Sequence, residues 1–287
     1  MESNSMYCGE AIGLIMSAFS FMMGACIASF LNVVIWRVPR GESIVSPPSH
    51  CPKCGAEIRW WQNLPILSWL ALRGKCAKCR APISPRYIIV ETIGGVLFLA
   101  AFWRFGEFAP FMWVWLSLMI AGSFIDFDHQ LLPDFVTVGG MVYGVVLSLA
   151  SWLVAPYLRV PTLPLYPGLQ PFAVPPLNSL VGLAFGFSLL WLVRYLGTKA
   201  FKREAMGMGD VFLMGAVGAL FGPVAVLMTL VLSSLFGSIV GIALVLAAKA
   251  KIGKFVAIPY GPYICLGCLA WMFWGPELVA WYVSLVK

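Results

Sequence analysis

Residues 109–126 read APFMWVWLSLMIAGSFID, an uncharged apolar run that ends in an aspartate. The run approaches the ~20 apolar residues that a helix needs to cross a bilayer. Over the 287 residues of the chain, 61% are hydrophobic and only 11% are charged, whereas a soluble domain is typically about 25% charged. The composition therefore predicts a polytopic membrane protein and excludes a soluble globular domain.

Further apolar runs flank this one on both sides, and together they predict an all-α membrane protein with about eight transmembrane helices. The sixth run is too short to cross a bilayer alone. We expect it to be tilted, or to form a bent pair with the seventh around Gly222-Pro223. The expected spans are 11–36, 87–103, 109–126, 135–156, 178–197, 210–222, 224–248 and 259–284.

The positions of the basic residues predict the orientation, because cytoplasmic loops of membrane proteins carry an excess of Lys and Arg. With the N-terminus outside, sixteen of the nineteen basic residues face the inner side. The exceptions are Arg104, Arg159 and Lys287. We therefore predict an N-out, C-out arrangement. The net charge of +7 is explained by this asymmetry and does not indicate a nucleic-acid partner.

The long inner segment divides the chain into three expected parts. These are a first span (1–36), a cytoplasmic loop domain that contains four cysteines (37–86), and a larger membrane core (87–287). The loop carries two Cys-x-x-Cys pairs with 21 residues between them, and the pairs continue as CGAEI and CRAPI. The four cysteines are Cys51, Cys54, Cys76 and Cys79.

Two such pairs can hold Zn²⁺ tetrahedrally through four thiolates. Four protein ligands leave no open coordination position, so the expected zinc is structural rather than catalytic. Disulfides are one alternative, although they rarely persist on the reducing side of a membrane. Redox-active thiols are another. We expect the neighbouring His50 to be a solvated loop residue and not a ligand.

Acidic residues are rare, with only 12 in the chain, and ionisable groups inside spans are costly enough to indicate function. Asp126 ends the third expected span and Asp210 begins the sixth, so the topology places both at the inner face. Paired carboxylates share a proton, so one can act as a base on water while the other polarises a peptide carbonyl. This is aspartic-protease chemistry. Gly207 and Gly209 would let a substrate strand approach the acid closely.

Other acidic residues have simpler interpretations. Asp134 is expected to cap the fourth span. Asp128 is expected to be a solvated residue at the membrane–water interface. Glu91, within the second span, could pair with a basic loop residue or contribute to the site. Two other functions stay open at this point: a transporter, which would place its acids near the bilayer midplane, and a zinc-loop scaffold, which would need neither Asp126 nor Asp210.

Taken together, the motifs resemble those of the type IV prepilin peptidases, membrane aspartic proteases of the GxGD class. GACIASFLNVVIWRVPR resembles the first span of that family, the paired cysteines its inner loop, and AIPYGPYICLG the start of its last span. IDFDHQLLPD and GMGD resemble the two catalytic motifs. The resemblance places the catalytic aspartates on Asp126, seven residues before Pro133, and on Asp210. Two residues after Asp210, where the family often has lysine, this sequence has Phe212. The electrostatics around Asp210 therefore stay open.

The resemblance implies removal of a basic leader from type IV prepilins and type II secretion pseudopilins. Cleavage would follow a glycine, at the cytoplasmic face of the bacterial inner membrane. It also implies N-methylation of the new N-terminal residue by S-adenosylmethionine, for which the sequence offers no recognisable binding motif. A signal-peptide-peptidase-like protease shares GxGD but would lack the paired cysteines. The expected partners are prepilins, pseudopilins and membrane lipid, and the oligomeric state is open.

Overall fold

The computed structural model describes residues 2–158, 174–204, 206–247 and 259–286. Within these ranges the regular structure is helical, apart from two isolated bridges in the cysteine loop. Six helical stretches are long and apolar enough to cross a membrane. The prediction of an all-helical multi-pass membrane protein is therefore confirmed. The predicted inner segment around 249–254, together with Arg159 and Lys287, lies outside the described residues.

The chain forms two compact units, Met1–Ala121 and Gly122–Lys287. The boundary falls inside helix α4 (Ala109–His129). The first unit also contains η1 (Val38–Arg40), η2 (Trp60–Asn63), η3 (Gly106–Phe108) and the helices α1 (Glu2–Arg37), α2 (Leu67–Ala71) and α3 (Arg86–Phe105). The second contains α5 (Asp134–Leu158), α6 (Pro176–Phe201), α7 (Met208–Ala247) and α8 (Gly261–Val286).

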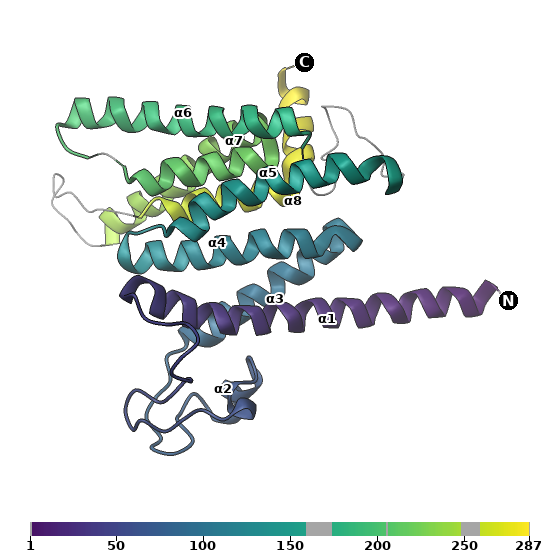
Figure 1. The fold of residues 1–287 in the computed structure, drawn as a ribbon, viewed down its shortest axis with the longest axis vertical. Helices are drawn as coiled ribbons and strands as arrows, with labels where there is room; N and C mark the ends of the chain where they lie inside the picture. The colour runs from purple at the N-terminus through teal and green to yellow at the C-terminus, as the bar shows by residue number, and fades with distance from the viewer. Residues whose placement is uncertain (1, 159–173, 205, 248–258, 287) are drawn as a thin grey trace. The chain divides into compact units, whose positions relative to one another are not determined.

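In the first unit, α1 lies along α3 (Figure 1). Gly24 and Gly94 face each other at this contact, where a Cβ on either residue would collide with the other helix. Small residues at a helix–helix contact let the two backbones approach closely, which is a common way to pack helices in membranes. The Phe98 ring of α3 stacks on Trp113 of α4 with centroids 5.2 Å apart.

In the second unit, α7 is the central helix and packs against α5, α6 and α8. Four of its side chains, Val211, Met214, Val217 and Leu220, have no exposed surface. Gly182 of α6 meets the backbone of α7 so closely that neither helix could carry a Cβ at the contact. The burial of its N-terminal half makes this part of α7 a firm support for the residues in its first turn.

The expected spans 210–222 and 224–248 correspond to α7, which consists of two helical segments joined at a kink and is described as far as Ala247. Inside it Gly222 has φ +81° and ψ 178°, followed by Pro223. Only glycine adopts this backbone conformation at little cost, and proline removes a helical hydrogen bond. The predicted bend at Gly222-Pro223 is confirmed. The number of eight crossings and the N-out orientation stay predictions.

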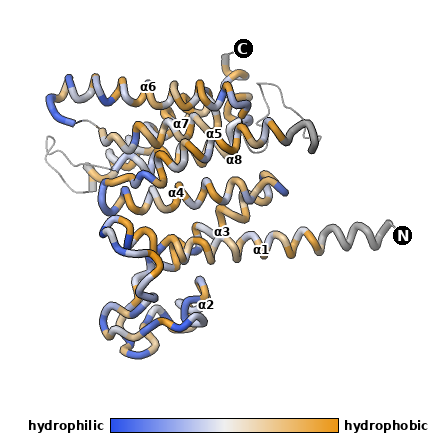
Figure 2. Tube along the Cα trace, viewed as in Figure 1, coloured by the Kyte–Doolittle hydropathy of each residue, from blue (hydrophilic) through white to orange (hydrophobic). Residues whose placement is uncertain are grey.

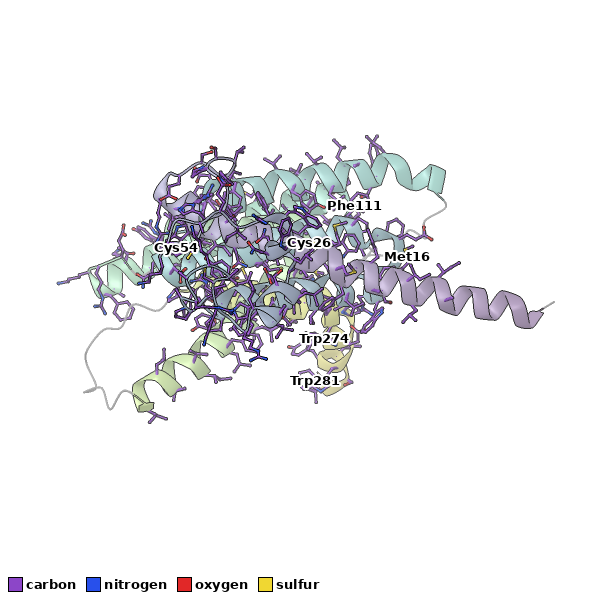
Figure 3. All side chains as sticks on the ribbon, turned by 90° about the horizontal axis from the view of Figure 1, so that it is seen from below. Met16, Cys26, Cys54, Phe111, Trp274 and Trp281 are labelled. Atoms are coloured by element: carbon purple, nitrogen blue, oxygen red, sulfur yellow. The ribbon has the colours of Figure 1, made fainter. Side chains whose placement is uncertain are left out.

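Many large apolar side chains on the long helices are exposed. Figure 3 labels four of them: Met16, Phe111, Trp274 and Trp281, which are 43%, 43%, 59% and 62% exposed. Apolar residues dominate the long helices, and hydrophilic residues are frequent in the cysteine loop and at helix ends (Figure 2). Lipid is the natural neighbour of such helix surfaces, because each helix satisfies its own backbone hydrogen bonds.

Candidate active site and cysteine cluster

The segment after α4 turns sharply into α5. α4 ends at His129, and Gln130 adopts a left-handed conformation (φ +52°) with its N–H donating to the Asp126 carbonyl at 2.8 Å. A left-handed residue of this kind commonly ends a helix. Pro133 then accepts a hydrogen bond from the Val136 N–H at 2.9 Å, at the start of α5. Asp126 is therefore fixed one turn before the end of α4.

Asp126 is buried inside the second unit, with 5% of the residue exposed. Its Oδ2 atom accepts a hydrogen bond of 2.9 Å from the backbone N–H of Gly261, the first residue of α8. A Cβ on Gly261 would lie 2.7 Å from this oxygen, so no side chain fits at that position. The N-terminal N–H groups of a helix are free to bind an anion. The start of α8 therefore binds the Asp126 carboxylate directly.

Leu132 joins the segments that carry the two aspartates. A Cβ on Gly209 would lie 2.8 Å from Leu132 Cβ, and one on Gly261 would lie 3.3 Å from Leu132 Cδ1. Gly209 directly precedes Asp210, and Gly261 binds Asp126. One buried leucine thus packs against both segments and holds them at the same place. Gly209 is needed for this contact with Leu132.

Asp210 lies in the first turn of α7 and is 7% exposed. Its Oδ1 atom is buried and accepts no hydrogen bond from the described part of the chain. A buried carboxyl oxygen without a donor is costly unless the group is protonated or a water or ligand supplies the donor. Gly207 is exposed beside Asp210, and a Cβ there would lie 3.5 Å from Asp210 Oδ2. The structure thus brings Asp126, Asp210 and the two predicted glycines together.

Two side chains that the sequence did not single out hold the neighbouring segments. The hydroxyl of Tyr260, just before Gly261, shares a hydrogen bond of 2.7 Å with Ser233 Oγ of α7. Arg194 of α6 donates to the Met206 carbonyl at 3.0 Å, just before Gly207. The sequence singles out neither residue, because a hydroxyl or a basic side chain carries no sign of its distant partner.

The four predicted metal ligands form one cluster. The sulfur atoms of Cys51, Cys54, Cys76 and Cys79 all lie within 4.8 Å of one another. The Sγ atoms of Cys51 and Cys79 are 3.8 Å apart. Zn–S bonds of ~2.3 Å in tetrahedral geometry require sulfurs about 3.8 Å apart. The donor set and its spacing therefore fit Zn²⁺, and the predicted pairing of the two cysteine motifs is confirmed.

The two cysteine turns have the same backbone geometry. Cys51 N–H donates to the Ala56 carbonyl at 2.9 Å, and Cys76 N–H to the Ala81 carbonyl at 2.8 Å. The backbone N–H groups of Cys79 and Lys78 hydrogen-bond to Cys76 Sγ and lower the pKa of this thiol to about 6. Because the thiolate is the form that binds metal, this geometry prepares Cys76 as a ligand near neutral pH.

Glu91 is buried in α3, with 7% of the residue exposed. Its Oε2 atom accepts a hydrogen bond of 2.7 Å from the backbone N–H of Ile66, the residue just before α2 in the cysteine loop. The observed partner of Glu91 is thus a backbone N–H of the cysteine loop. Its observed role is to tie the loop to α3.

Comparison with known proteins covers most of the chain. Residues 22–105 match the bacterial peptidase A24 N-terminal domain, and residues 113–242 match the type IV leader peptidase family. The prepilin leader peptidase/N-methyltransferase of Stutzerimonas stutzeri is 31% identical over 93% of this chain and 94% of its own length. The chain belongs to the type IV leader peptidase family. Its members named here are prepilin leader peptidase/N-methyltransferases, enzymes that process type IV prepilins.

Two further relatives support the assignment of the chain to the leader peptidase family. The prepilin leader peptidase/N-methyltransferase of Myxococcus xanthus is 42% identical over 82% of this chain, which spans 65% of that protein. The type 4 prepilin-like proteins leader peptide-processing enzyme of Escherichia coli is 33% identical over 87% of this chain and 91% of its own length. No solved structure matches the chain. The resemblance seen in the motifs is thus confirmed over nearly the full sequence.

Arg194 is predicted to support leader removal through the segment that leads into Asp210. Arg194→Gln removes the donor to the Met206 carbonyl and the ion pair with the exposed Glu204. We expect the rate to fall about fivefold, the value of the one backbone hydrogen bond of ~1 kcal/mol, because an exposed ion pair contributes little. Initial rates with a synthetic prepilin would measure this. Lys199→Gln removes an equal charge from an exposed position of the same helix and should leave the rate unchanged. Equal rates for both variants would contradict the positioning role of Arg194.

Proposed function

We propose that this chain removes the leader of a type IV prepilin with Asp126 and Asp210 as its catalytic pair. The observation that carries the proposal is the meeting of two buried aspartates around Leu132 and Gly261. Both lie in the first or last turn of long apolar helices, where a membrane protein meets water. A prepilin whose leader leaves its apolar helix at this depth would present its scissile bond to the pair.

The environments of the two aspartates assign their roles. Asp126 accepts the Gly261 N–H, a hydrogen bond that favours the charged carboxylate. Asp210 is buried with Oδ1 lacking a donor, which favours the protonated acid. Asp126 is therefore the base that takes a proton from water, and Asp210 is the acid that hydrogen-bonds to the scissile carbonyl.

The bond changes follow from these roles. The water oxygen attacks the carbonyl carbon while its proton passes to Asp126, and the proton of Asp210 passes to the carbonyl oxygen. The resulting tetrahedral species collapses as Asp126 gives its proton to the leaving amine nitrogen and the C–N bond breaks. Asp210 recovers its proton from the tetrahedral hydroxyl. The products are the leader carboxylic acid and the new N-terminal amine.

Orientation in the membrane forms part of the proposal. The inner side carries most of the basic residues in an N-out, C-out arrangement with eight crossings. In this arrangement the aspartate pair lies at the cytoplasmic face of the membrane and the cysteine loop in the cytoplasm. We assign the protein to the bacterial inner membrane on this basis. A periplasm-specific reporter fused after Lys287 should be active, and the same reporter inserted between residues 41 and 42 should be inactive. The opposite pattern would reverse the orientation.

The proposed function also includes N-methylation of the new terminal amine, as the names of the relatives state for those proteins. Zn²⁺ held by the four cysteines would fix the cytoplasmic loop and take no part in the chemistry. Pseudopilins of type II secretion are proposed as further substrates, because they share the basic leader and the apolar helix.

The test uses the full-length protein in lipid nanodiscs with a synthetic prepilin, followed by mass spectrometry. We expect loss of the leader after its last glycine, and one added methyl group only when S-adenosylmethionine is present. A matched prepilin with valine in place of that glycine should stay intact. If the folded, zinc-loaded protein left the first prepilin uncut, or cut both prepilins equally, the proposed specificity would be wrong.

Gly261→Ala tests the support of Asp126. The added methyl group would lie 2.7 Å from Asp126 Oδ2, so the carboxylate or the start of α8 must move. Because misplacing a catalytic group by ~1 Å can cost about a hundredfold, we expect a loss of leader removal of that order. Gly139→Ala is the matched control, since a Cβ there meets only the Asp134 carbonyl at 3.9 Å. A fully active Gly261→Ala protein would contradict this role.

A further inference from the structure

The cysteine loop contains one long apolar run without charge. Residues 60–72 read WWQNLPILSWLAL, with Arg59 directly before them and Arg73 directly after them. An apolar stretch of ~10–14 residues is too short to cross a bilayer, and it is typical of a buried core helix or of a segment that lies at a membrane interface. The burial of its side chains distinguishes these two possibilities.

The run does not form a buried core. It contains η2 and α2, and no residue of the run is buried. Trp60, Leu67 and Leu70 are 75%, 66% and 55% exposed. Leu67 and Leu70 are three residues apart on α2 and therefore share one face of this helix, whereas the Trp69 ring packs against Gly74. An outward face of tryptophan and leucine in a loop indicates an apolar neighbour outside the loop.

The two helices that flank the loop provide a scale of depth. Asn32 of α1 donates to the Tyr87 carbonyl, in the first turn of α3, at 3.4 Å. Further along α3, Gly94 lies against Ala28 of α1, where it has no room for a Cβ. The segment of α3 from 87 to 94 is therefore level with residues 28–32 of α1. Because α1 ends at Arg37, this level lies ~8–14 Å inside the helix end at 1.5 Å per residue.

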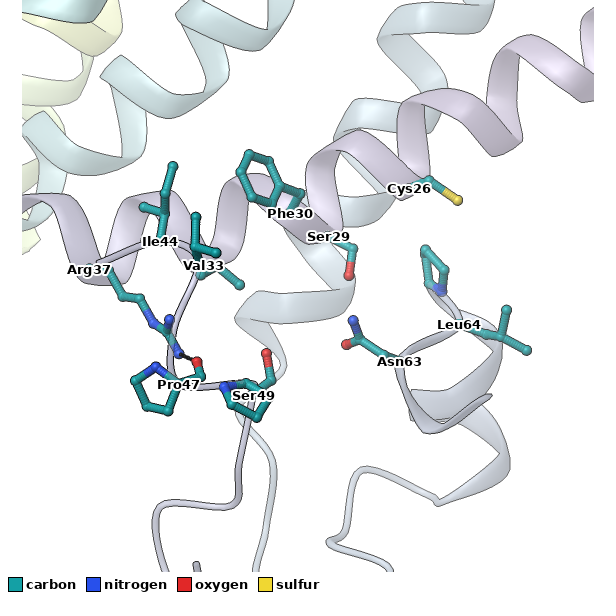
Figure 4. A pocket seen from close by; sticks show the side chains of 13 residues that line it. Cys26, Ser29, Phe30, Val33, Arg37, Ile44, Pro47, Ser49, Asn63 and Leu64 are labelled. Carbon is teal, nitrogen blue, oxygen red and sulfur yellow. Dashed lines mark hydrogen bonds between the residues drawn. The ribbon is translucent and has the colours of Figure 1, made fainter. Parts of the chain in front are cut away.

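The apolar run lies at this level, beside the membrane helices. Its Ile66 N–H donates to Glu91 Oε2 of α3 at 2.7 Å, and Glu91 belongs to the segment 87–94. Leu64 lines one cavity together with Cys26 and Ser29 of α1, and lies on their side of it (Figure 4). Since one leaflet contributes ~15 Å to the hydrocarbon core of a bilayer, the run is at the depth of the acyl chains.

The backbone of the run is suited to a lipid environment, where every polar group needs an internal partner. The N–H of Ser68 donates to the Leu64 carbonyl at 3.0 Å, and the N–H of Leu70 to the Ile66 carbonyl at 3.1 Å. The Ser68 hydroxyl donates to the Trp61 carbonyl at 2.8 Å and so joins α2 to η2. The run is therefore a compact element with apolar side chains outside and hydrogen bonds inside.

We propose that residues 60–72 form a membrane anchor that enters the inner leaflet, where Trp60, Leu67 and Leu70 contact lipid acyl chains. The inner leaflet is the one at which α1 ends in the proposed orientation. Tryptophan suits the boundary between headgroups and acyl chains. Arg59 and Arg73 can bind lipid phosphates while their stems lie in apolar surroundings. The anchor holds the four-cysteine cluster at the membrane surface, and it does not depend on the proposed peptidase chemistry.

Photo-crosslinking of the full-length protein in phosphatidylcholine nanodiscs tests the proposal. Leu67→p-benzoylphenylalanine and Trp60→p-benzoylphenylalanine are irradiated, and their peptides are analysed by mass. We expect both to bond to lipid, and a fatty acid to stay attached after the lipid esters are hydrolysed. The control is Glu57→p-benzoylphenylalanine, at an exposed position of the same loop. Its lipid yield should be at least about tenfold lower, because this position lies outside the apolar run and meets water.

A second measurement uses Leu67→Glu/Leu70→Glu, again in nanodiscs. A charged side chain among acyl chains is costly, so the run should leave the leaflet and trypsin should cut after Arg59 or Arg73 at least about tenfold faster than in the wild type. Leu67→Met/Leu70→Met keeps the face apolar and should be cut at the wild-type rate. Equal cleavage of the two double variants would contradict the anchor.

Zinc content and leader removal are measured on every variant, so that folding is checked independently. Equal lipid yields at positions 57 and 67, or attachment to headgroups alone, would overturn insertion into the leaflet. Crosslinks to a second copy of the chain or to an added prepilin, in place of lipid, would overturn it as well. If the Leu67 variant fails to fold, the Trp60 variant decides the question. Failure of leader removal in the wild type would overturn the proposed function and leave this test unaffected.

Discussion

Asp126→Asn and Asp210→Asn are each expected to reduce leader removal by at least about a thousandfold, because general acid–base catalysis of this kind contributes ~10²–10⁴-fold and each change removes one of two coupled groups. Asparagine has the shape of aspartate, so the hydrogen bond from Gly261 N–H to position 126 can persist and the fold should be kept. The measurement is the initial rate of leader loss from a synthetic prepilin, followed by mass.

Asp128→Asn is the matched control for these variants. It lies two residues from Asp126 at the end of the same helix, but on an exposed part of the chain. We expect its rate to stay within about twofold of wild type, because exposed surface changes usually have small effects. Loss of activity in Asp128→Asn with retention in Asp126→Asn would move the first catalytic position to residue 128.

Cys76→Ser is expected to remove the metal and unfold the cysteine loop. Structural zinc sites supply ~10–16 kcal/mol of folding free energy in small zinc-binding peptides, and the loop consists of short turns with two isolated bridges and little regular structure of its own. We expect about one zinc per wild-type chain, since the four sulfurs form one cluster within 4.8 Å and the variant keeps only three thiolates. Elemental analysis and limited proteolysis of residues 37–86 measure both effects.

His50→Ala is the control for the metal site. His50 adjoins Cys51 but is exposed and does not belong to the four-sulfur cluster. Its ring lies 3.2 Å from the Pro48 carbonyl. Metal content and protease resistance should therefore equal those of the wild type. Loss of zinc from His50→Ala, with retention in Cys76→Ser, would show that the ligand set has been assigned wrongly.

The membrane fold could be predicted because its determinants are local in the sequence. An uncharged run such as 109–126 specifies a membrane helix by itself, and Gly222-Pro223 specifies a bend by the backbone preferences of two residues. The cysteine cluster was predictable because two Cys-x-x-Cys pairs at this spacing are typical of four ligands around a single metal ion. The division of the chain inside α4 was not, because it depends on which helices pack together.

The contacts around the two aspartates could likewise be predicted only in part, because they depend on which distant segments pack together. Asp126 and Asp210 stand out as rare acids in apolar surroundings. The donor to Asp126 is the backbone N–H of Gly261, 135 residues away, and a backbone group leaves no sign of its partner in the sequence. Leu132 packs against both Gly209 and Gly261. The sequence could not predict this contact, because nothing distinguishes Leu132 from the many other leucines of the chain. Gly209 was expected to admit substrate, whereas its close contact is with Leu132.

The most direct test of the central claim is the rate of leader removal by the double variant Asp126→Asn/Asp210→Asn, measured beside both single variants in long incubations. If the two aspartates act on one substrate as a unit, the second substitution costs little once the first is made, because such effects are strongly non-additive. We predict that the double variant retains the residual rate of the single variants. A rate lower by the product of the two single losses would mean that the aspartates act independently, and would contradict a shared catalytic pair.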